Sequence, residues 1–203
     1  MAKLYFTYAS MNAGKSTILL QAAHNYRERG MQVMLWTSQH HADLFGKTGE
    51  ISSRIGIADP ADIFSAETDL FAAVEKRRSL GPLNAIFIDE AQFLTDAQVW
   101  QVARIADRQD VPVLAYGLRT DFRGNLFPGA ATLLAIADDL REVRTICHCG
   151  RKATMTARLD QTGHALTEGD QVSVEKQAYV SLCRRHWEEE MGRWPDPQEP
   201  KSA

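Results

Sequence analysis

Apolar runs alternate with stretches of helical periodicity along the first two thirds of the chain. Residues 4–8 form a short apolar run that predicts a strand. Residues 16–29 then carry apolar positions at roughly helical spacing, Gly30 is a natural stop, and residues 32–37 predict a second strand. A strand, a helix and a strand in this order favour a parallel sheet with helices on both faces. The pattern therefore predicts an α/β fold.

Further elements follow in the same alternating order. Strands are expected at 85–90 and 111–116, and helices at 69–78, 96–107 and 129–137, the first two capped by Thr68 and Thr95. Residues 40–56 and 117–128 show little periodicity and are expected to form loops.

The pattern changes near Thr145, where we place a domain boundary. It separates a nucleotide-binding domain (1–145) from a small second domain (146–190). In the second domain, residues 158–174 contain Gly163 and Gly169 and predict a hairpin and a loop. The chain after Trp187 is expected to fray, and residues 191–203 to form a flexible tail.

The tripeptide Gly14-Lys15-Ser16 stands where the first predicted strand meets the first predicted helix. In that position, loop N–H groups and a helix N-terminus form a cradle for phosphate. The lysine then reaches the β- and γ-phosphates, and the serine hydroxyl ligates Mg²⁺. The motif also asks for a glycine five residues before Gly14, where this chain has Ala9. The alternative is an ordinary turn in which Ser16 caps the helix, but the preceding strand favours phosphate binding.

Two adjacent carboxylates, Asp89 and Glu90, end the predicted strand 85–90. This edge of an open α/β sheet carries ligands, and an acid there holds Mg²⁺ in nucleotide-binding enzymes. Because side chains alternate along a strand, we expect the two acids to point to opposite faces. Asp89 would then hold the metal and its waters, while Glu90 would accept a proton. The alternative is two solvated acids that only end a core strand.

Three cysteines and a histidine form two close pairs near the end of the chain. Cys147 and Cys149 are followed, after residues 150–182, by Cys183 and His186. Two pairs of such ligands fit a four-coordinate structural Zn²⁺ site with no open position for water. His148 is a rival ligand, although three consecutive ligands would be awkward. The alternative is a set of buried apolar cysteines beside a chance histidine.

Composition and charge narrow the class of protein. The chain of 203 residues has 44% hydrophobic and 24% charged residues, an ordinary globular balance. Its net charge of −3 offers no general attraction to nucleic acid or an anionic membrane, so we expect neither as a partner. Neither a membrane-spanning run nor a secretion signal is evident. Three cysteines cannot pair completely, which fits a reducing compartment, and we expect a cytoplasmic protein.

Four separated motifs, in order, resemble those of the cytosolic-type (type II) thymidine kinases, with the bacterial branch closest. They are MNAGKST at 11–17, DEAQF at 89–93, GLRTDF at 117–122 and YVSLCRRH at 179–186, and the resemblance runs from residue 4 to about 187. It implies an ATP:thymidine 5′-phosphotransferase with a P-loop, RecA-like α/β domain, a small zinc domain and a homotetrameric assembly. It also implies that Glu90 is the general base for the 5′-hydroxyl, with Lys15 as the second catalytic residue.

The motifs and the resemblance together give three sets of expected site residues. ATP and Mg²⁺ are expected at Ala9, Ser10, Met11, Asn12, Ala13, Gly14, Lys15, Ser16, Thr17, Asp89, Glu90, Ala91 and Gln92. By resemblance, thymidine is expected at Met11, Phe93, Leu118, Phe122, Phe127, Thr156 and Tyr179. Zn²⁺ is expected at Cys147, Cys149, Cys183 and His186. The family closes a lasso-like loop over the base, and this chain departs from it at Val174–Gln177, where it reads VEKQ in place of a Gly-Gly and is one residue shorter.

Two other functions would use the same motifs. A DNA-binding ATPase would explain the phosphate loop, the acids and the Cys/His set, but the negative net charge and the lack of a dense basic stripe disfavour it. A nucleotide-binding subunit without catalysis would explain Ala9 and the altered lasso, and it would bind ATP without turnover.

Overall fold

A six-stranded parallel sheet forms the centre of the molecule in a computed structural model, which describes residues 1–45, 49–171 and 178–193. The strand order is β5-β2-β6-β7-β1-β8. These strands are β1 (Leu4–Ala9), β2 (Val33–Ser38), β5 (Asp62–Phe64), β6 (Ala85–Ile88), β7 (Val113–Leu118) and β8 (Asp139–Glu142). The α/β fold with a parallel sheet is confirmed.

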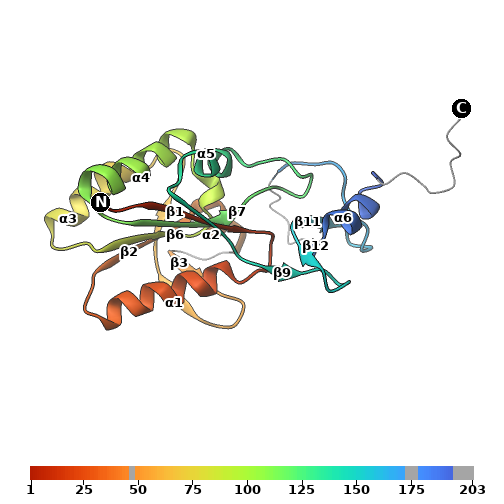
Figure 1. Ribbon diagram of the computed structural model, residues 1–203, viewed down its shortest axis with the longest axis horizontal. Helices are drawn as coiled ribbons and strands as arrows, with labels where there is room; N and C mark the ends of the chain where they lie inside the picture. The colour runs from red at the N-terminus through yellow and green to blue at the C-terminus, as the bar shows by residue number, and fades with distance from the viewer. Residues whose placement is uncertain (46–48, 172–177, 194–203) are drawn as a thin grey trace, which may run out of the picture.

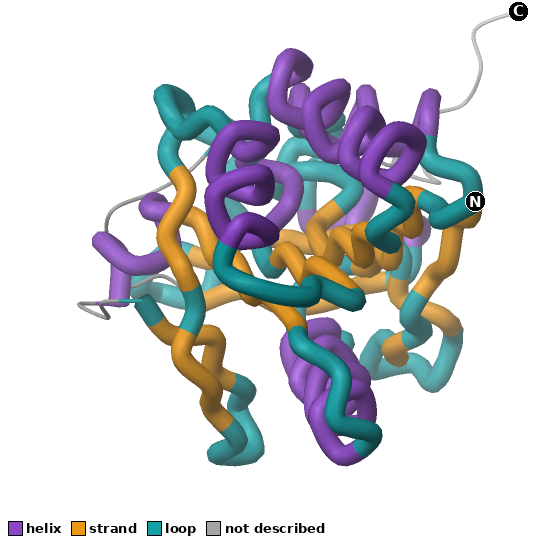
Figure 2. Tube along the Cα trace, turned by 90° about the vertical axis from the view of Figure 1, so that its left-hand side faces the viewer, coloured by secondary structure: helices purple, strands orange, loops and turns teal. Residues whose placement is uncertain are grey.

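Helices cover both faces of this sheet (Figures 1 and 2). They are α1 (Lys15–Glu28) on one face and α3 (Leu70–Ser79), α4 (Asp96–Gln109) and α5 (Pro128–Ile136) on the other. Phe87 is buried in a cluster with α1, whereas its neighbour Ile88 is buried in a larger cluster with the other three helices. Successive residues of β6 point to opposite faces, so one apolar strand supports both layers.

A smaller unit, the C-terminal unit (residues 145–193), lies beyond the end of the sheet toward which β1 runs (Figure 1). It consists of β9 (Thr145–Ile146), β10 (Lys152–Ala153), β11 (Met155–Leu159), β12 (Ala178–Leu182) and α6 (Arg184–Glu190). Strands β9 and β10 pair antiparallel, as do β11 and β12. Its buried cluster is small and consists of Cys147, Ala153, Ala157, Leu182, Cys183, Trp187 and Met191. A core of this size needs further support, because few apolar side chains are removed from water.

The structure corrects two local predictions. The loop expected at 40–56 is wrong, because α2 (Gln39–Phe45) and a hairpin of β3 (Glu50–Ser52) with β4 (Ala58–Pro60) occupy much of it. These elements are too short to show a clear period. Thr68 does not cap α3. Asp69 does, accepting the Ala72 N–H at 3.0 Å.

Two boundaries also differ from those expected. β7 begins and ends two residues later than predicted, at Val113 and Leu118. Fraying after Trp187 is wrong for the described residues, because α6 continues to Glu190. By contrast, Thr95 caps α4 as predicted. Its hydroxyl accepts the Gln98 N–H, and its own N–H donates to the Gln98 side-chain oxygen. Residues 194–203 and the altered lasso segment Val174–Gln177 lie outside the described residues. Among the described helices, none is both long and apolar enough to cross a membrane.

Candidate phosphotransfer site and metal cluster

The phosphate-binding motif lies between the end of β1 and the start of α1. Gly14 precedes the first helical residue with φ 83°, and Asn12 has φ 62°. A left-handed conformation at Gly14 carries no steric cost, because glycine lacks a Cβ. The Lys15 ammonium donates to the Ser10 carbonyl oxygen at 3.3 Å. The tight turn and the helix N-terminus that a phosphate cradle needs are therefore both present.

Asp89 directly follows β6, which β7 separates from β1 in the sheet, and its side chain contacts the start of α1. Its carboxylate accepts a hydrogen bond from the Ser16 hydroxyl at 2.8 Å, and the residue is only 3% exposed. Burial, reinforced by the nearby Glu90, raises the pKa of Asp89 to about 7, although Ser16 and Lys15 act in the opposite direction. Burial also lowers the pKa of Lys15, against the attraction of both carboxylates. The lysine, the hydroxyl and the acid thus form one partly buried polar cluster, with Asp89 at its buried end.

Glu90 takes a conformation that the sequence did not predict. β6 ends at Ile88, and Glu90 has φ 54°, so it is not a strand residue and the alternation argument does not apply. Its carboxylate accepts a hydrogen bond from the Gln92 side chain at 2.5 Å. The oxygen of the same Gln92 amide accepts the Leu118 N–H at 2.9 Å. Gln92 therefore fixes Glu90 relative to β7.

Gly117 makes this arrangement possible. A Cβ at this position would lie 2.8 Å from the Gln92 side-chain oxygen and 2.9 Å from the Gln92 backbone nitrogen. The absence of a side chain lets the 3₁₀ turn Ala91–Phe93 approach β7 closely. Gln92 was expected among the ATP-binding residues, and the structure places it against Glu90 and Leu118.

The residues expected around a nucleoside come from both parts of the molecule. The rings of Phe93 and Phe127 meet edge to face at 5.7 Å. Phe122 is buried under the guanidinium of Arg158, 3.8 Å from its ring centre. Thr156 and Tyr179 lie on β11 and β12 and contact the phosphate loop: the Thr156 hydroxyl accepts the Met11 N–H at 3.1 Å, and the Tyr179 carbonyl accepts the Asn12 side-chain amide at 3.2 Å.

Two residues that the sequence did not single out belong to the same region. Ser181 donates its hydroxyl proton to the Met11 carbonyl oxygen at 2.5 Å. Arg158 is 3% exposed and donates to the Asp170 carbonyl at 2.9 Å. Alternation along the strand that contains YVSLC could have predicted that Ser181 points to the opposite face from Leu182. Nothing in the local sequence indicates that its partner is Met11.

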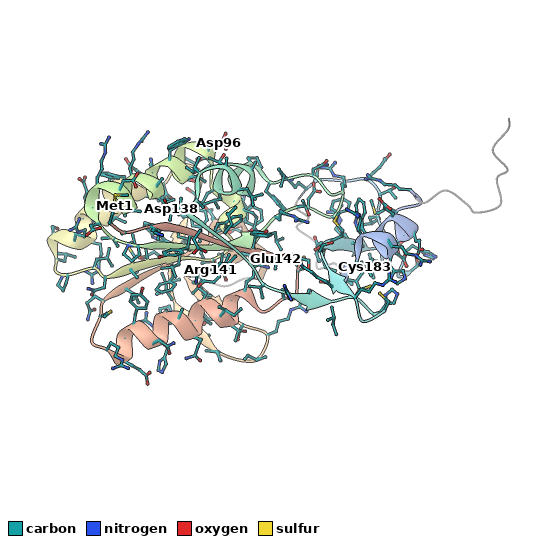
Figure 3. The ribbon with its side chains drawn as sticks, viewed as in Figure 1. Met1, Asp96, Asp138, Arg141, Glu142 and Cys183 are labelled. Atoms are coloured by element: carbon teal, nitrogen blue, oxygen red, sulfur yellow. The ribbon has the colours of Figure 1, made fainter. Side chains whose placement is uncertain are left out.

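The four predicted metal ligands lie together in the C-terminal unit (Figure 3 labels Cys183). The ligand atoms of Cys147, Cys149, Cys183 and His186 all lie within 4.8 Å of one another. The Cys149 and Cys183 sulfurs are 3.9 Å apart, and the His186 Nδ1 atom lies 3.2 Å from the Cys147 sulfur and 3.6 Å from the Cys183 sulfur. This convergence of three thiols and an imidazole indicates a structural metal site.

The surroundings of the cluster suit metal binding. Burial opposes ionisation of Cys147, but N–H groups at Cys149 and Cys183 and the His186 ring together lower its pKa to about 6, which favours the thiolate. The Nε2 atom of His186 points toward the Glu189 carboxylate, 3.7 Å away. His148 stacks on His186 with ring centres 4.2 Å apart and is not one of the four converging ligands.

A parallel α/β sheet, a GKS turn opening its first helix and a buried acid bonded to the serine of that turn are the features of a P-loop nucleotide-binding protein. Similarity to known proteins makes the class specific. A family model described as "Thymidine kinase" matches residues 2–187. The chain belongs to the thymidine kinase family, whose members are ATP-dependent phosphotransferases.

Three relatives illustrate the similarity, each described as "Thymidine kinase". The protein from Ruegeria pomeroyi is 62% identical over 95% of this chain and 96% of its own length. The protein from Mesorhizobium japonicum is 61% identical over 95% of this chain and 94% of its own length. The protein from Rhizobium meliloti is 58% identical over 94% of this chain and 98% of its own length. A solved structure of a DNA replication initiation factor aligns with a TM-score of 0.38 at 13% identity over 70% of this chain and 40% of its own, a likeness too small to carry an argument.

Proposed function

We propose that this protein transfers the γ-phosphoryl group of ATP to the 5′-hydroxyl of thymidine, forming dTMP for DNA synthesis by salvage. The observation that carries the proposal is the partly buried cluster of Lys15, Ser16 and Asp89, with Glu90 next to it. Thymidine is the acceptor named by the relatives, which are nearly full-length matches.

The phosphate loop and the acids have separate tasks in this proposal. The backbone of residues 9–14 surrounds the phosphates, Lys15 neutralises charge on the transferred group, and Ser16 with Asp89 holds Mg²⁺. The hydroxyl and carboxylate oxygens of this pair are the hard donors that Mg²⁺ prefers. When bound, the ion neutralises charge that develops on the phosphates. Thr17, Ala91 and Gln92 complete the assigned ATP and Mg²⁺ region.

Glu90 accepts the proton of the 5′-hydroxyl in the proposed reaction. Its carboxylate has a fixed position, because Gln92 holds one oxygen. Phosphoryl transfer demands mainly positioning and neutralisation of charge, with a base that takes the acceptor proton. The proposed nucleoside pocket uses Met11, Phe93, Leu118, Phe122, Phe127, Thr156 and Tyr179. The structure adds that Thr156 and Tyr179 contact the phosphate loop itself.

The free energy of each contact with the nucleobase predicts the preference among nucleosides. Thymidine differs from deoxyuridine by one methyl group, and burying a methyl contributes roughly 0.8 kcal/mol, a few-fold in affinity. We therefore expect kcat/KM for deoxyuridine within about tenfold of that for thymidine. Deoxycytidine presents a different hydrogen-bonding edge and would leave buried groups unpaired, so its kcat/KM should be lower by about 10⁴-fold. Steady-state rates with the three nucleosides at saturating MgATP measure both ratios, and equal use of deoxycytidine would contradict the pocket.

We infer that the metal in the C-terminal unit is Zn²⁺. Tetrahedral zinc with usual bond lengths sets sulfur–sulfur distances of about 3.8 Å and sulfur–nitrogen distances of about 3.6 Å. The observed separations of 3.9 Å between sulfurs and of 3.6 and 3.2 Å between sulfur and nitrogen are close to these values. Four protein ligands leave no site for water, so the role is structural. On this basis we propose residues 1–145 as the kinase domain, 146–190 as the zinc-binding lasso domain and 191–203 as a tail.

We propose a homotetramer in the cytoplasm. A hollow of about 540 Å³ opens between α1 and the β8 edge of the sheet, with Tyr5, Tyr26, Leu114 and Arg141 among its lining residues (Figure 3 labels Arg141). The proposal rests on the resemblance to the cytosolic-type thymidine kinases, and this hollow is a part of the surface that is open to a second copy. Sedimentation velocity of the full chain should give a species of four chains at micromolar concentration, and a monomer would contradict the assembly.

A further inference from the structure

One residue of the phosphate loop, Met11, is held at both its backbone N–H and its carbonyl oxygen by the C-terminal unit. The Met11 N–H donates to the Thr156 hydroxyl at 3.1 Å, and the Met11 carbonyl accepts from the Ser181 hydroxyl at 2.5 Å. Thr156 and Ser181 are directly opposite each other in the β11–β12 pair. Such a pair places both side chains on one face of the two strands. The two hydroxyls therefore hold both backbone polar groups of one residue, Met11, and so the two peptide groups that flank it.

A third bond reinforces this contact. The Asn12 side-chain amide donates to the Tyr179 carbonyl oxygen at 3.2 Å, and Asn12 has a left-handed backbone with φ 62°. Met11 and Asn12 lie between the end of β1 and Lys15, so the loop that would surround the phosphates is fixed by the β11–β12 ribbon. Side-chain hydrogen bonds across such a contact hold one arrangement of the backbone.

The same face of the ribbon continues toward the proposed nucleoside pocket. Arg158 pairs with Tyr179, two positions along each strand from Thr156 and Ser181, so the two pairs share a face. The Arg158 guanidinium lies 3.8 Å from the centre of the Phe122 ring. Phe122 belongs to the loop that follows β7.

Arg158 also holds the chain that follows the hairpin. It donates to the carbonyl oxygens of Asp170 at 2.9 Å and Glu168 at 3.4 Å. A Cβ at Gly169 would lie 2.4 Å from the guanidinium, so residues 168–170 approach the arginine as closely as a glycine allows. The nearby Gln171 amide donates to the buried Asp121 carboxylate at 3.2 Å. These contacts join the 168–171 segment to the loop after β7.

We propose that the β11–β12 ribbon couples the two substrate sites, with Ser181 as the positioning residue that transmits the effect. Nucleoside that orders the loop around Phe122 and the 168–171 segment also orders the ribbon. The ordered ribbon then fixes the backbone at Met11 and improves the loop for ATP. Thermodynamic linkage requires the converse, so ATP tightens nucleoside binding by the same factor. This inference rests on the proposed function.

Equilibrium binding to the full zinc-loaded chain tests the coupling. Titration calorimetry gives the Kd of the Mg²⁺ complex of the non-hydrolysable analogue AMP-PNP, with and without saturating thymidine. For the parent chain we expect thymidine to tighten this binding by at least about 5-fold, the lower range of measured couplings. In Ser181→Ala the ratio should fall below about 2-fold, while each ligand still binds alone. A variant that weakens both ligands equally but keeps the ratio would show that Ser181 is only structural.

Two further variants complete the design. Thr162→Ala removes a hydroxyl from the same unit that bonds to Asp160 and His164 in the hairpin turn, and it should keep the parent ratio. Asn12→Gly removes the bond to Tyr179 yet tolerates the left-handed backbone, so it should lower the ratio even if Ser181→Ala fails to fold. Unchanged coupling in Asn12→Gly and Ser181→Ala, or no coupling in the parent chain, would overturn the inference. A parent chain that binds AMP-PNP but no thymidine would instead overturn the proposed function.

Discussion

Glu90→Gln is expected to lower kcat by about 10²–10⁴-fold, the usual contribution of a positioned general base. The variant keeps a side-chain oxygen that can accept the Gln92 hydrogen bond, so the 3₁₀ turn and its contact with β7 should persist. It cannot accept the proton of the 5′-hydroxyl. Because Lys15, Ser16 and Asp89 are unchanged, the Kd for the Mg²⁺ complex of AMP-PNP should stay within about twofold. Steady-state kinetics with thymidine and calorimetry with the analogue measure these two quantities.

Glu75→Gln is the matched control for this change. Glu75 lies on an exposed position of α3, so the same substitution there should leave kcat unaltered. If Glu90→Gln has the same kcat as the parent chain, the assignment of Glu90 as the general base is wrong. Loss of analogue binding together with turnover would instead assign Glu90 to the phosphate and metal site.

Cys183→Ser is expected to abolish zinc binding and to unfold the C-terminal unit. Structural zinc contributes roughly 10–16 kcal/mol of apparent folding free energy in small metal-binding domains. The buried cluster around Cys183 and Trp187 is too small to replace such a term. Because Thr156 and Ser181 hold the backbone N–H and C=O of Met11, loss of the unit should also weaken the phosphate loop. Elemental analysis of the purified chain and its thermal unfolding measure the change.

His148→Ala is the informative control for the metal site. His148 stacks on His186 but lies outside the four converging ligands, so this variant should retain one zinc ion per chain. Loss of zinc from His148→Ala would contradict the ligand set. Retention of zinc in His148→Ala would exclude the rival ligand that the sequence left open.

The parts of the site that are contiguous in the sequence could be predicted from it. A strand followed by Gly14-Lys15-Ser16, and the acids after a buried strand, are local patterns whose chemistry follows from their order. The metal ligands could be predicted for a similar reason, because the spacing within each pair is short. The capping of α4 by Thr95 was also local. In each case the relevant physics acts over a few residues.

Contacts between distant segments could not be predicted in this way. Ser181 and Met11 are 170 positions apart, and neither residue type indicates the other. The conformation of Glu90 depends on Gln92 and on the close approach at Gly117, which are set by packing rather than by strand alternation. Helix α2 and the β3–β4 hairpin were missed because elements of seven and three residues give almost no periodicity.

Transfer of label from ATP to a nucleoside tests the central claim most directly. The full chain is incubated with Mg²⁺, ATP labelled in its γ-phosphate and a panel of ribo- and deoxynucleosides, with and without single-stranded DNA. The account predicts labelled dTMP from thymidine, a comparable amount of labelled dUMP from deoxyuridine and no effect of DNA. Release of labelled inorganic phosphate that DNA stimulates, with no labelled nucleoside monophosphate, would contradict it.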